Sequence, residues 1–321
     1  YLKLTTAILI SFAGIYFSFL GINYENLFNE FMNVDYSGLV LSTFLLIFSC
    51  LIRAYRWKIL INPLEKISIK IIFSSTMIGY FGNGVLAFRL GELLKAYSIS
   101  KNSKIDTAQA FGTVIIERFL DLLMVLLIFI LVVPWFPFHN ETIKLGIITF
   151  SIITLAVSIV LFLFLKINLS SVKLLKEESK SKILKLFFKI VENIFNSFKI
   201  IQKTDNKLKL ILYSVSLWSI YIIITKIILI SCDIRLTFPD TIILFIIGSL
   251  SLGIPALPGS AGTYDASIKY GLMAIFLIES NKALSYAIIS HSISYFPLVI
   301  IGALYFFSNT YSLKDLKQIR S

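Results

Sequence analysis

The sequence predicts an all-α fold: a polytopic integral membrane helical bundle. Of its 321 residues, 57% are hydrophobic and only 15% are charged, and the mean hydropathy is +0.86. A soluble domain carries about 25% charged residues. Here the apolar residues also form long unbroken runs, as membrane-spanning helices do. The length favours a single membrane domain over residues 1–321.

Full spans are predicted wherever an apolar run is long enough to cross about 30 Å of hydrocarbon, which takes about 20 helical residues. Six runs meet this length, at about 4–22, 37–60, 107–133, 143–165, 209–231 and 283–308. No small-residue cleavage site follows the first run, so we interpret it as a true span rather than a signal peptide.

Two further apolar stretches are too broken to be ordinary spans. The stretch 68–100 is interrupted by Gly79, Gly82 and Gly84, which we expect to turn the backbone. The stretch 239–279 is split at residues 254–259, and its first piece, Thr241–Ile254, has 14 residues. At 1.5 Å per residue such a helix is about 21 Å long, so it passes the midplane without crossing.

Charge asymmetry predicts the topology. The linkers 23–36 and 134–142 contain no Lys or Arg, whereas 166–209 contains eleven lysines, and the C-terminal tail is also basic. The positive-inside rule therefore places both termini, the 61–70 linker and 166–209 in the cytoplasm, with the chain integral to the cell membrane. Each broken stretch then enters and leaves on one side, as a re-entrant helical hairpin.

The predicted order of elements repeats. A span, a hairpin and a span over about 37–133 recur over about 209–308 in the opposite orientation, which is typical of inverted-topology repeats. The linker between them, about 166–208, has apolar residues at helical spacing with lysines between them. We expect an amphipathic helix that lies on the cytoplasmic leaflet.

This topology is testable at Lys180. A single cysteine that replaces Lys180, in a background without the native Cys50 and Cys232, should react with a membrane-impermeant maleimide only from the cytoplasmic side. Labelling from outside intact cells would contradict the predicted orientation.

Composition and motifs also exclude some functions. The net charge is +12, but the lysines lie between apolar runs, where they orient the chain and meet anionic lipid headgroups. We therefore expect no nucleic-acid partner. No phosphate loop or metal-binding motif is present, so no cofactor and no metal is expected. His139 and His291 are isolated in sequence, and packing is the more common role for His291.

The first candidate group follows the glycines of 68–100 and comprises Asn83, Arg89 and Glu92. With a second helix starting near Phe88, Arg89 and Glu92 share a face at i, i+3. Arg89 could hold a lipid phosphate through bidentate hydrogen bonds. The alternative is a structural ion pair between Arg89 and Glu92 that locks the hairpin.

The second candidate group is Glu117, Arg118 and Asp121, in the cytoplasmic third of a predicted span. Glu117 and Asp121 face one way at i, i+4. Charged residues at membrane depth are rare and mark functional sites. The alternative is a buried network in which these carboxylates neutralise Arg53, Arg56 or Arg89.

The third candidate group lies in 255–265 and comprises Pro258, Gly259, Ser260, Gly262, Thr263 and Asp265. Proline stops one helix there and glycine allows a turn. With the next helix starting near Ser260, free N–H groups would make an anion site deep in the membrane. The alternative is that Asp265 only caps the helix. We expect Asp265 to point towards Lys269 or an arginine of the first repeat, unless it binds a cationic headgroup or a proton itself.

At these groups the chain resembles a known family, the flippase-type membrane domain of lysylphosphatidylglycerol synthases and its stand-alone relatives, which include archaeal proteins of dolichol-linked glycosylation. The resemblance spans about 40–310. It rests on Arg53-Ala54-Tyr55-Arg56-Trp57, Arg89-Leu90-Gly91-Glu92-Leu93-Leu94-Lys95, Glu117-Arg118 with Asp121, and Pro255 through Asp265. The chain departs from the family pattern at Asp265, where the family usually has Glu, and at Ala87, where it often has Pro.

The resemblance implies lipid translocation and not lipid synthesis, because the aminoacyl-transfer domain of the full synthases does not follow the last span. We therefore expect a non-enzymatic flippase or scramblase for a phospholipid or a lipid-linked headgroup. The alternatives are a membrane-embedded transferase, with Glu92, Glu117 or Asp265 as base, and a non-catalytic partner subunit of a lipid-modifying system. The sequence does not decide the oligomeric state, and a homodimer is one arrangement that it allows.

Overall fold

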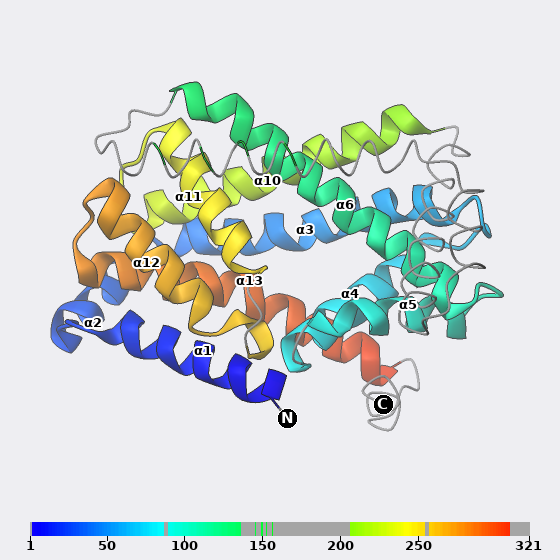
Figure 1. Cartoon of the computed structure of the whole chain (residues 1–321), viewed down its shortest axis with the longest axis horizontal. Coiled ribbons are helices and arrows are strands. Elements are labelled where there is room, and N and C mark those ends of the chain that lie inside the picture. Colours follow the sequence, from blue (N-terminus) through cyan, green and yellow to red (C-terminus); the bar gives the residue numbers. More distant parts are fainter. Residues whose placement is uncertain are drawn as a thin grey trace, which may run out of the picture.

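The protein was analysed as a computed structural model that describes residues 2–86, 89–135, 206–253 and 257–308, with isolated helical positions between 145 and 156. Every regular element in these ranges is a helix (Figure 1), which confirms the all-α prediction. Three described helices are long and apolar enough to cross a membrane, or four if one bent pair near the N-terminus is counted as a span. The predicted span 143–165 and the amphipathic linker 166–208 lie outside the described ranges, apart from those isolated positions.

Apart from the stretch between η2 and α10, which lies mostly outside the described ranges, short connections join the helices. Their bounds are α1 (Leu2–Phe19), α2 (Tyr24–Met32), α3 (Tyr36–Ile61), α4 (Ile69–Val85), α5 (Gly91–Lys101), α6 (Thr107–Val132), α10 (Lys207–Ser231), α11 (Phe238–Ser251), α12 (Thr263–Phe276) and α13 (Ser280–Ser308), with 3-10 turns η2 (Val133–Trp135) and η3 (Pro258–Ser260). The predicted runs 37–60, 209–231 and 283–308 correspond to α3, α10 and α13. The run 107–133 corresponds to α6, and the linker 23–36 contains the helix α2.

Short polar side chains set several helix starts. At the start of α3, Asp35 accepts hydrogen bonds from the Ser37 hydroxyl at 2.7 Å and from the Ser37 amide at 3.0 Å, and these two hydrogen bonds lower the pKa of Asp35. Asp106 accepts a hydrogen bond from the Ala108 amide at 3.0 Å at the start of α6. Thr237 and Asp240 form a capping box at the start of α11. Such side chains satisfy N–H groups that have no partner within the helix.

The first hairpin is formed by α4 and α5, which pack against each other (Figure 1). The glycines have a different role from the one expected. They do not turn the backbone, because α4 is helical through to Val85. A Cβ on Gly82 would lie 2.6 Å from the Cα of Gly91, so glycine allows the two helices to approach closely. The helix α5 begins at Gly91 rather than near Phe88.

Gly91 should tolerate no side chain. A Cβ there would lie 2.2 Å from the Gly79 carbonyl oxygen and 2.3 Å from the Asn83 nitrogen, which are backbone atoms that cannot move aside. We expect Gly91→Ala to destabilise the protein by about 1–3 kcal/mol or more through overpacking, seen as a lower Tm in detergent. Gly271→Ala is the matched control, since its Cβ would meet Ile247 at an ordinary 3.4 Å. Equal Tm values for both variants would contradict this packing.

The second hairpin is formed by α11 and α12, which also pack together and are not one continuous span. We expected Pro258 and Gly259 to end the first helix of this hairpin, and this prediction is wrong. That helix ends at Ser251. Pro258 and Gly259 instead form η3 within the connection, and α12 begins at Thr263 rather than near Ser260.

Helix α1 packs on this second hairpin through small residues. A Cβ on Gly14 would lie 2.6 Å from the Gly262 carbonyl carbon, and the Leu257 amide donates to the Ser11 hydroxyl at 2.8 Å. Lys269 is buried and donates to the carbonyl oxygens of Ser18, at 2.8 Å, and Leu20, at 3.0 Å. A lysine suits the negative end of the α1 dipole, so Lys269 stabilises the end of α1.

Two sets of helices have the same order, a long helix, a hairpin and a long helix. They are α3–α6 and α10–α13. In Figure 1, α3 and α10 pack side by side and run in opposite directions, and the two hairpins approach the centre from opposite ends. This order agrees with the expected pattern, and the inverted-repeat and re-entrant assignments stay predictions.

Candidate functional site

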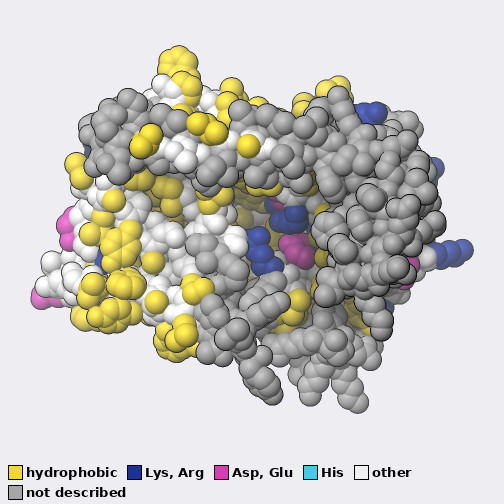
Figure 2. Space-filling view, viewed as in Figure 1, with side chains coloured by type: hydrophobic (Ala, Val, Ile, Leu, Met, Phe, Trp, Pro, Cys, Tyr) yellow, Lys and Arg dark blue, Asp and Glu magenta, His cyan; other side chains and the backbone are white. Residues whose placement is uncertain are grey.

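A cavity of about 730 Å³ lies where the two hairpins approach each other. Its lining comes from both sets of helices: α3, α4, α5 and α6 of the first, and α10, α11, η3, α12 and α13 of the second. Figure 2 shows an opening near the centre of one face, with Lys or Arg and Asp or Glu side chains at its base. The cavity therefore joins a charged wall to the turn of the second hairpin.

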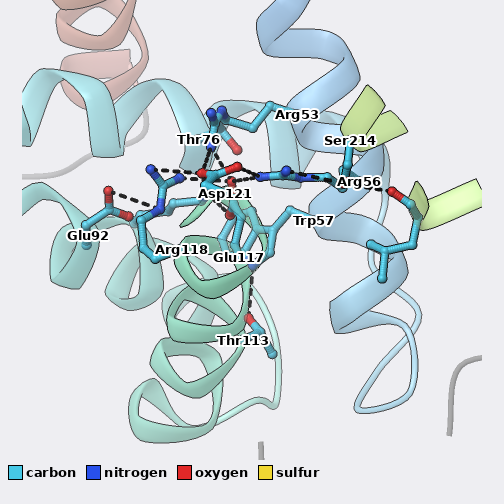
Figure 3. A network of polar contacts seen from close by, with 12 residues as sticks. Arg53, Arg56, Trp57, Thr76, Glu92, Thr113, Glu117, Arg118, Asp121 and Ser214 are labelled. Atoms are coloured by element: carbon cyan, nitrogen blue, oxygen red, sulfur yellow. Dashed lines mark hydrogen bonds and ion pairs between the residues drawn. The ribbon is translucent and has the colours of Figure 1, made fainter. Parts of the chain in front are cut away.

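Glu117 of α6 is the centre of the charged wall. It is completely buried, and its two oxygens lie 2.7 Å from Arg53 Nη1 and 2.5 Å from Lys95 Nζ. Arg56 and Arg118 also contact it, at 3.4 and 3.1 Å (Figure 3). One carboxylate thus contacts four cations from α3, α5 and α6. A buried charge persists only when it is paired in this way.

Asp121, one turn further along α6, completes the wall. Its oxygens lie 2.7 Å from Arg56 Nη2, 3.0 Å from Arg53 Nη1 and 3.3 Å from Arg118 Nη1. Arg118 in turn lies 3.7 Å from Glu92 on α5 (Figure 3). The structure therefore has the buried network with Arg53 and Arg56 that the sequence offered as an alternative, and its cations do not include Arg89.

Neighbouring side chains fix this wall to the bundle. Arg53 Nη2 donates to the Tyr221 hydroxyl of α10 at 3.2 Å. The Trp57 indole donates to Thr113 at 2.9 Å, and the Lys95 ammonium lies 4.0 Å from the Trp57 ring centroid. Lys95 was not among the predicted site residues. Its signal was its position three residues after Glu92, on the same helix face.

Arg89 differs from the other cations. It lines the cavity and is exposed, and among the described residues it has no ion pair or hydrogen bond. The alternative pairing of Arg89 with Glu92 is not observed. Arg89 precedes α5 with a φ of +56°, so the two side chains do not share a helix face. Glu92 instead contacts Arg118 and accepts a hydrogen bond from Asn83 at 3.4 Å.

The cavity lining carries excess positive charge. Setting aside the histidine pair described below, four lining cations face two lining carboxylates, a surplus of two. They are Arg53, Arg89, Lys95 and Arg118 against Glu92 and Asp121. Arg56 and Glu117 behind them cancel. The Trp218 side chain also lines the cavity, and its buried indole N–H has no hydrogen-bond partner among the described residues.

The opposite wall is the turn of the second hairpin, where Pro258, Gly259 and Ser260 line the cavity. The expected free N–H groups at 261–263 do not face it. Gly262 packs against α1, and its N–H donates to Asp265 Oδ2 at 3.0 Å. The Thr263 hydroxyl donates to the Ser260 carbonyl at 3.0 Å. The start of α12 is therefore capped by Asp265 of the same chain, which agrees with the alternative given for this group in the sequence.

We expected Asp265 to point towards Lys269 or an arginine, but it points towards His291. Its Oδ1 lies 2.9 Å from His291 Nδ1 on α13, and His291 Nε2 lies 2.8 Å from the Gly259 carbonyl oxygen. Lys269 is bound to α1 instead. His291, which looked isolated in the sequence, thus joins the α12 helix start to the hairpin turn and lines the cavity.

Tyr295, one turn after His291 on α13, contacts both hairpin turns. Its hydroxyl donates to the Gly84 carbonyl at the end of α4 at 2.9 Å. A Cβ on Gly259 would lie 2.5 Å from the Tyr295 ring, so glycine is needed there. The two hairpins meet at this tyrosine.

Long apolar helices and two helical hairpins around a charged interior cavity define an integral membrane protein. The model of the lysylphosphatidylglycerol synthase TM region matches residues 4–302. The chain belongs to that family.

Two archaeal relatives are similar to the chain. The UPF0104 membrane protein MJ1078 of Methanocaldococcus jannaschii is 28% identical over 235 residues, which is 71% of this chain and 93% of that protein. The UPF0104 membrane protein MJ1595 of the same organism is 30% identical over 137 residues, 42% of this chain and 41% of that protein. No solved structure matches the chain significantly.

Proposed function

We propose that this protein is a flippase or scramblase that moves a phospholipid or a lipid-linked polar headgroup across the cell membrane. Both termini would lie in the cytoplasm. The observation that carries the proposal is the interior cavity, with a surplus of two positive charges and with Arg89, which has no ion pair or hydrogen bond in the described part of the chain. A cation without a partner at membrane depth is unfavourable, and an anionic headgroup would supply the missing partner.

The headgroup would occupy the cavity while the acyl or prenyl tails remain in the bilayer. Arg89 would hold the phosphate through bidentate hydrogen bonds. The buried Trp218 indole N–H, which has no hydrogen-bond partner within the described ranges, would add a neutral donor once its side chain turned towards the headgroup. The paired wall around Glu117 would provide a fixed positive potential without itself binding the headgroup. Movement of the two sets of helices against each other would then open the cavity to each leaflet in turn.

The test is reconstitution of the purified protein into vesicles that contain a fluorescent lipid. Headgroup movement is followed by quenching the outer-leaflet dye with a membrane-impermeant reductant, for an anionic lipid and for a zwitterionic lipid with identical tails. We expect faster loss of protected fluorescence than in protein-free vesicles, with the anionic lipid moving faster.

Recovery of the lipid and mass spectrometry complete the test. Unchanged lipid after movement supports translocation. Chemically altered lipid would support the transferase alternative, and no movement of either lipid would contradict the proposal.

A further inference from the structure

His291 makes two hydrogen bonds that a neutral, isolated imidazole cannot make together. Nδ1 lies 2.9 Å from Asp265 Oδ1, and Nε2 lies 2.8 Å from the Gly259 carbonyl oxygen. A carbonyl oxygen only accepts, so Nε2 must carry a hydrogen. An ionised carboxylate also only accepts, so Nδ1 must then carry a hydrogen too, which makes the ring an imidazolium.

The only other arrangement with both hydrogen bonds keeps the ring neutral and protonates Asp265 on Oδ1. The second oxygen, Oδ2, already accepts the Gly262 N–H at 3.0 Å, so the hydrogen would lie between Oδ1 and Nδ1. Both arrangements contain one proton more than a neutral histidine beside an ionised aspartate. The geometry therefore describes a pair that has bound a proton.

We propose that the His291–Asp265 pair is a proton-binding site whose occupancy fixes the turn of the second hairpin to α13. Proton binding at this pair would make the proposed lipid movement depend on pH, so the functional part of this inference rests on the proposed function. His291 itself lines the cavity, so a proton can reach the pair from the space that the headgroup would use.

Loss of the proton must break one contact. If the remaining hydrogen is on Nδ1, the Gly259 carbonyl loses its donor. If it is on Nε2, a ring lone pair faces the ionised Asp265. Gly259 also packs against the Tyr295 ring, and the Tyr295 hydroxyl donates a hydrogen bond to the Gly84 carbonyl of the first hairpin. Deprotonation thus loosens the place where the two hairpins meet.

Within the described ranges, the other titratable groups whose rings contact the pair are phenols. The Tyr264 ring of α12 lies 5.0 Å from the His291 ring, between centroids, and its hydroxyl donates to Ser290 at 3.3 Å. The Tyr295 ring of α13 lies 6.1 Å away. From the α4–α5 side, Arg89 lines the same cavity as His291. Lys269 of α12 donates to α1, which leaves Asp265 as the charged partner of His291 among the described residues.

The first experiment observes the proton directly and needs no transport. The chain has two histidines, so His139→Gln leaves His291 as the single histidine. In nanodiscs, ¹⁵N-histidine NMR of this variant should show either two protonated ring nitrogens near neutral pH, or a protonated Nε2 with Nδ1 accepting from a protonated Asp265. Adding Asp265→Asn should move the histidine titration to lower pH, because the charged partner is lost. A neutral ring with its hydrogen on Nδ1, or an unchanged titration in the double variant, would overturn the proposal.

The second experiment links the proton to lipid movement. Anionic-lipid movement by the wild type should change several-fold as pH rises through the titration of His291 seen by NMR. In Asp265→Asn that pH dependence should be lost or moved with the NMR titration. Tyr264→Phe removes the nearest phenol and is the control, with the pH dependence kept. A wild type that moves lipid at a rate independent of pH across that titration would overturn the coupling, whereas absence of all lipid movement would contradict the proposed function and leave the NMR result to decide the proton site.

Discussion

Replacing Arg89 with glutamine should slow movement of an anionic fluorescent lipid by about 10-fold to 100-fold while leaving the Tm of the protein unchanged. A charge-assisted hydrogen bond to a phosphate contributes about 1.5–3 kcal/mol, and about 1.4 kcal/mol corresponds to a factor of ten. Stability should be retained because Arg89 has no ion pair or hydrogen bond within the described part of the chain. The measurement is the vesicle quenching assay beside a thermal melt in detergent.

Arg235→Gln is the matched control, since Arg235 is an exposed loop arginine 3.9 Å from Asp233 and outside the cavity lining. It should transport at the wild-type rate. Normal anionic-lipid movement by folded Arg89→Gln would remove Arg89 from the site. Failure of that variant to fold would show a structural role that its contacts do not reveal.

In contrast to Arg89→Gln, Glu117→Gln should strongly destabilise the protein. The substitution keeps the shape of the side chain but leaves Arg53, Arg56, Lys95 and Arg118 with less negative charge in a buried site. Breaking a buried ion pair by removing one partner costs about 3–5 kcal/mol. We expect little folded protein after purification and a strongly lowered Tm.

The double variant Glu117→Gln/Lys95→Gln tests the cause, because it removes one cation together with the carboxylate. It should recover part of the lost stability. Glu25→Gln, an exposed glutamate at the start of α2, should stay within about 0.5 kcal/mol of wild type. A double variant no more stable than Glu117→Gln would show that lost packing, rather than unpaired charge, causes the defect.

The long helices were predictable because their signal is local. The runs that became α3, α10 and α13 are apolar over enough residues to be recognised from length alone. The broken stretches were also recognised, but the role of Gly79 and Gly82 was not. A glycine that permits a turn and a glycine that permits close packing look the same in sequence, and only the position of Gly91 across the hairpin separates them.

The candidate site was predictable in part. Arg53 and Arg56 lie at i, i+3 on one helix, as Glu117 and Asp121 lie at i, i+4 on another, so a network between them could be proposed from spacing alone. The pairing of His291 with Asp265 could not, because 26 residues separate them and the contact depends on how α12 packs against α13. A half-buried histidine such as His291 has no sequence signal beyond its unexpected place in an apolar run.

The hydrogen bonds of Lys269 to the end of α1 join α1 to the second hairpin, so the two should move as one unit. Although α1 precedes both sets of helices in the chain, the carbonyl groups at its end accept hydrogen bonds from Lys269 of α12, and its Gly14 packs against Gly262. Any displacement of the second hairpin must therefore carry α1 with it or break those bonds. A fluorophore at the exposed Phe12 would then report the motion of a hairpin more than two hundred residues away in sequence.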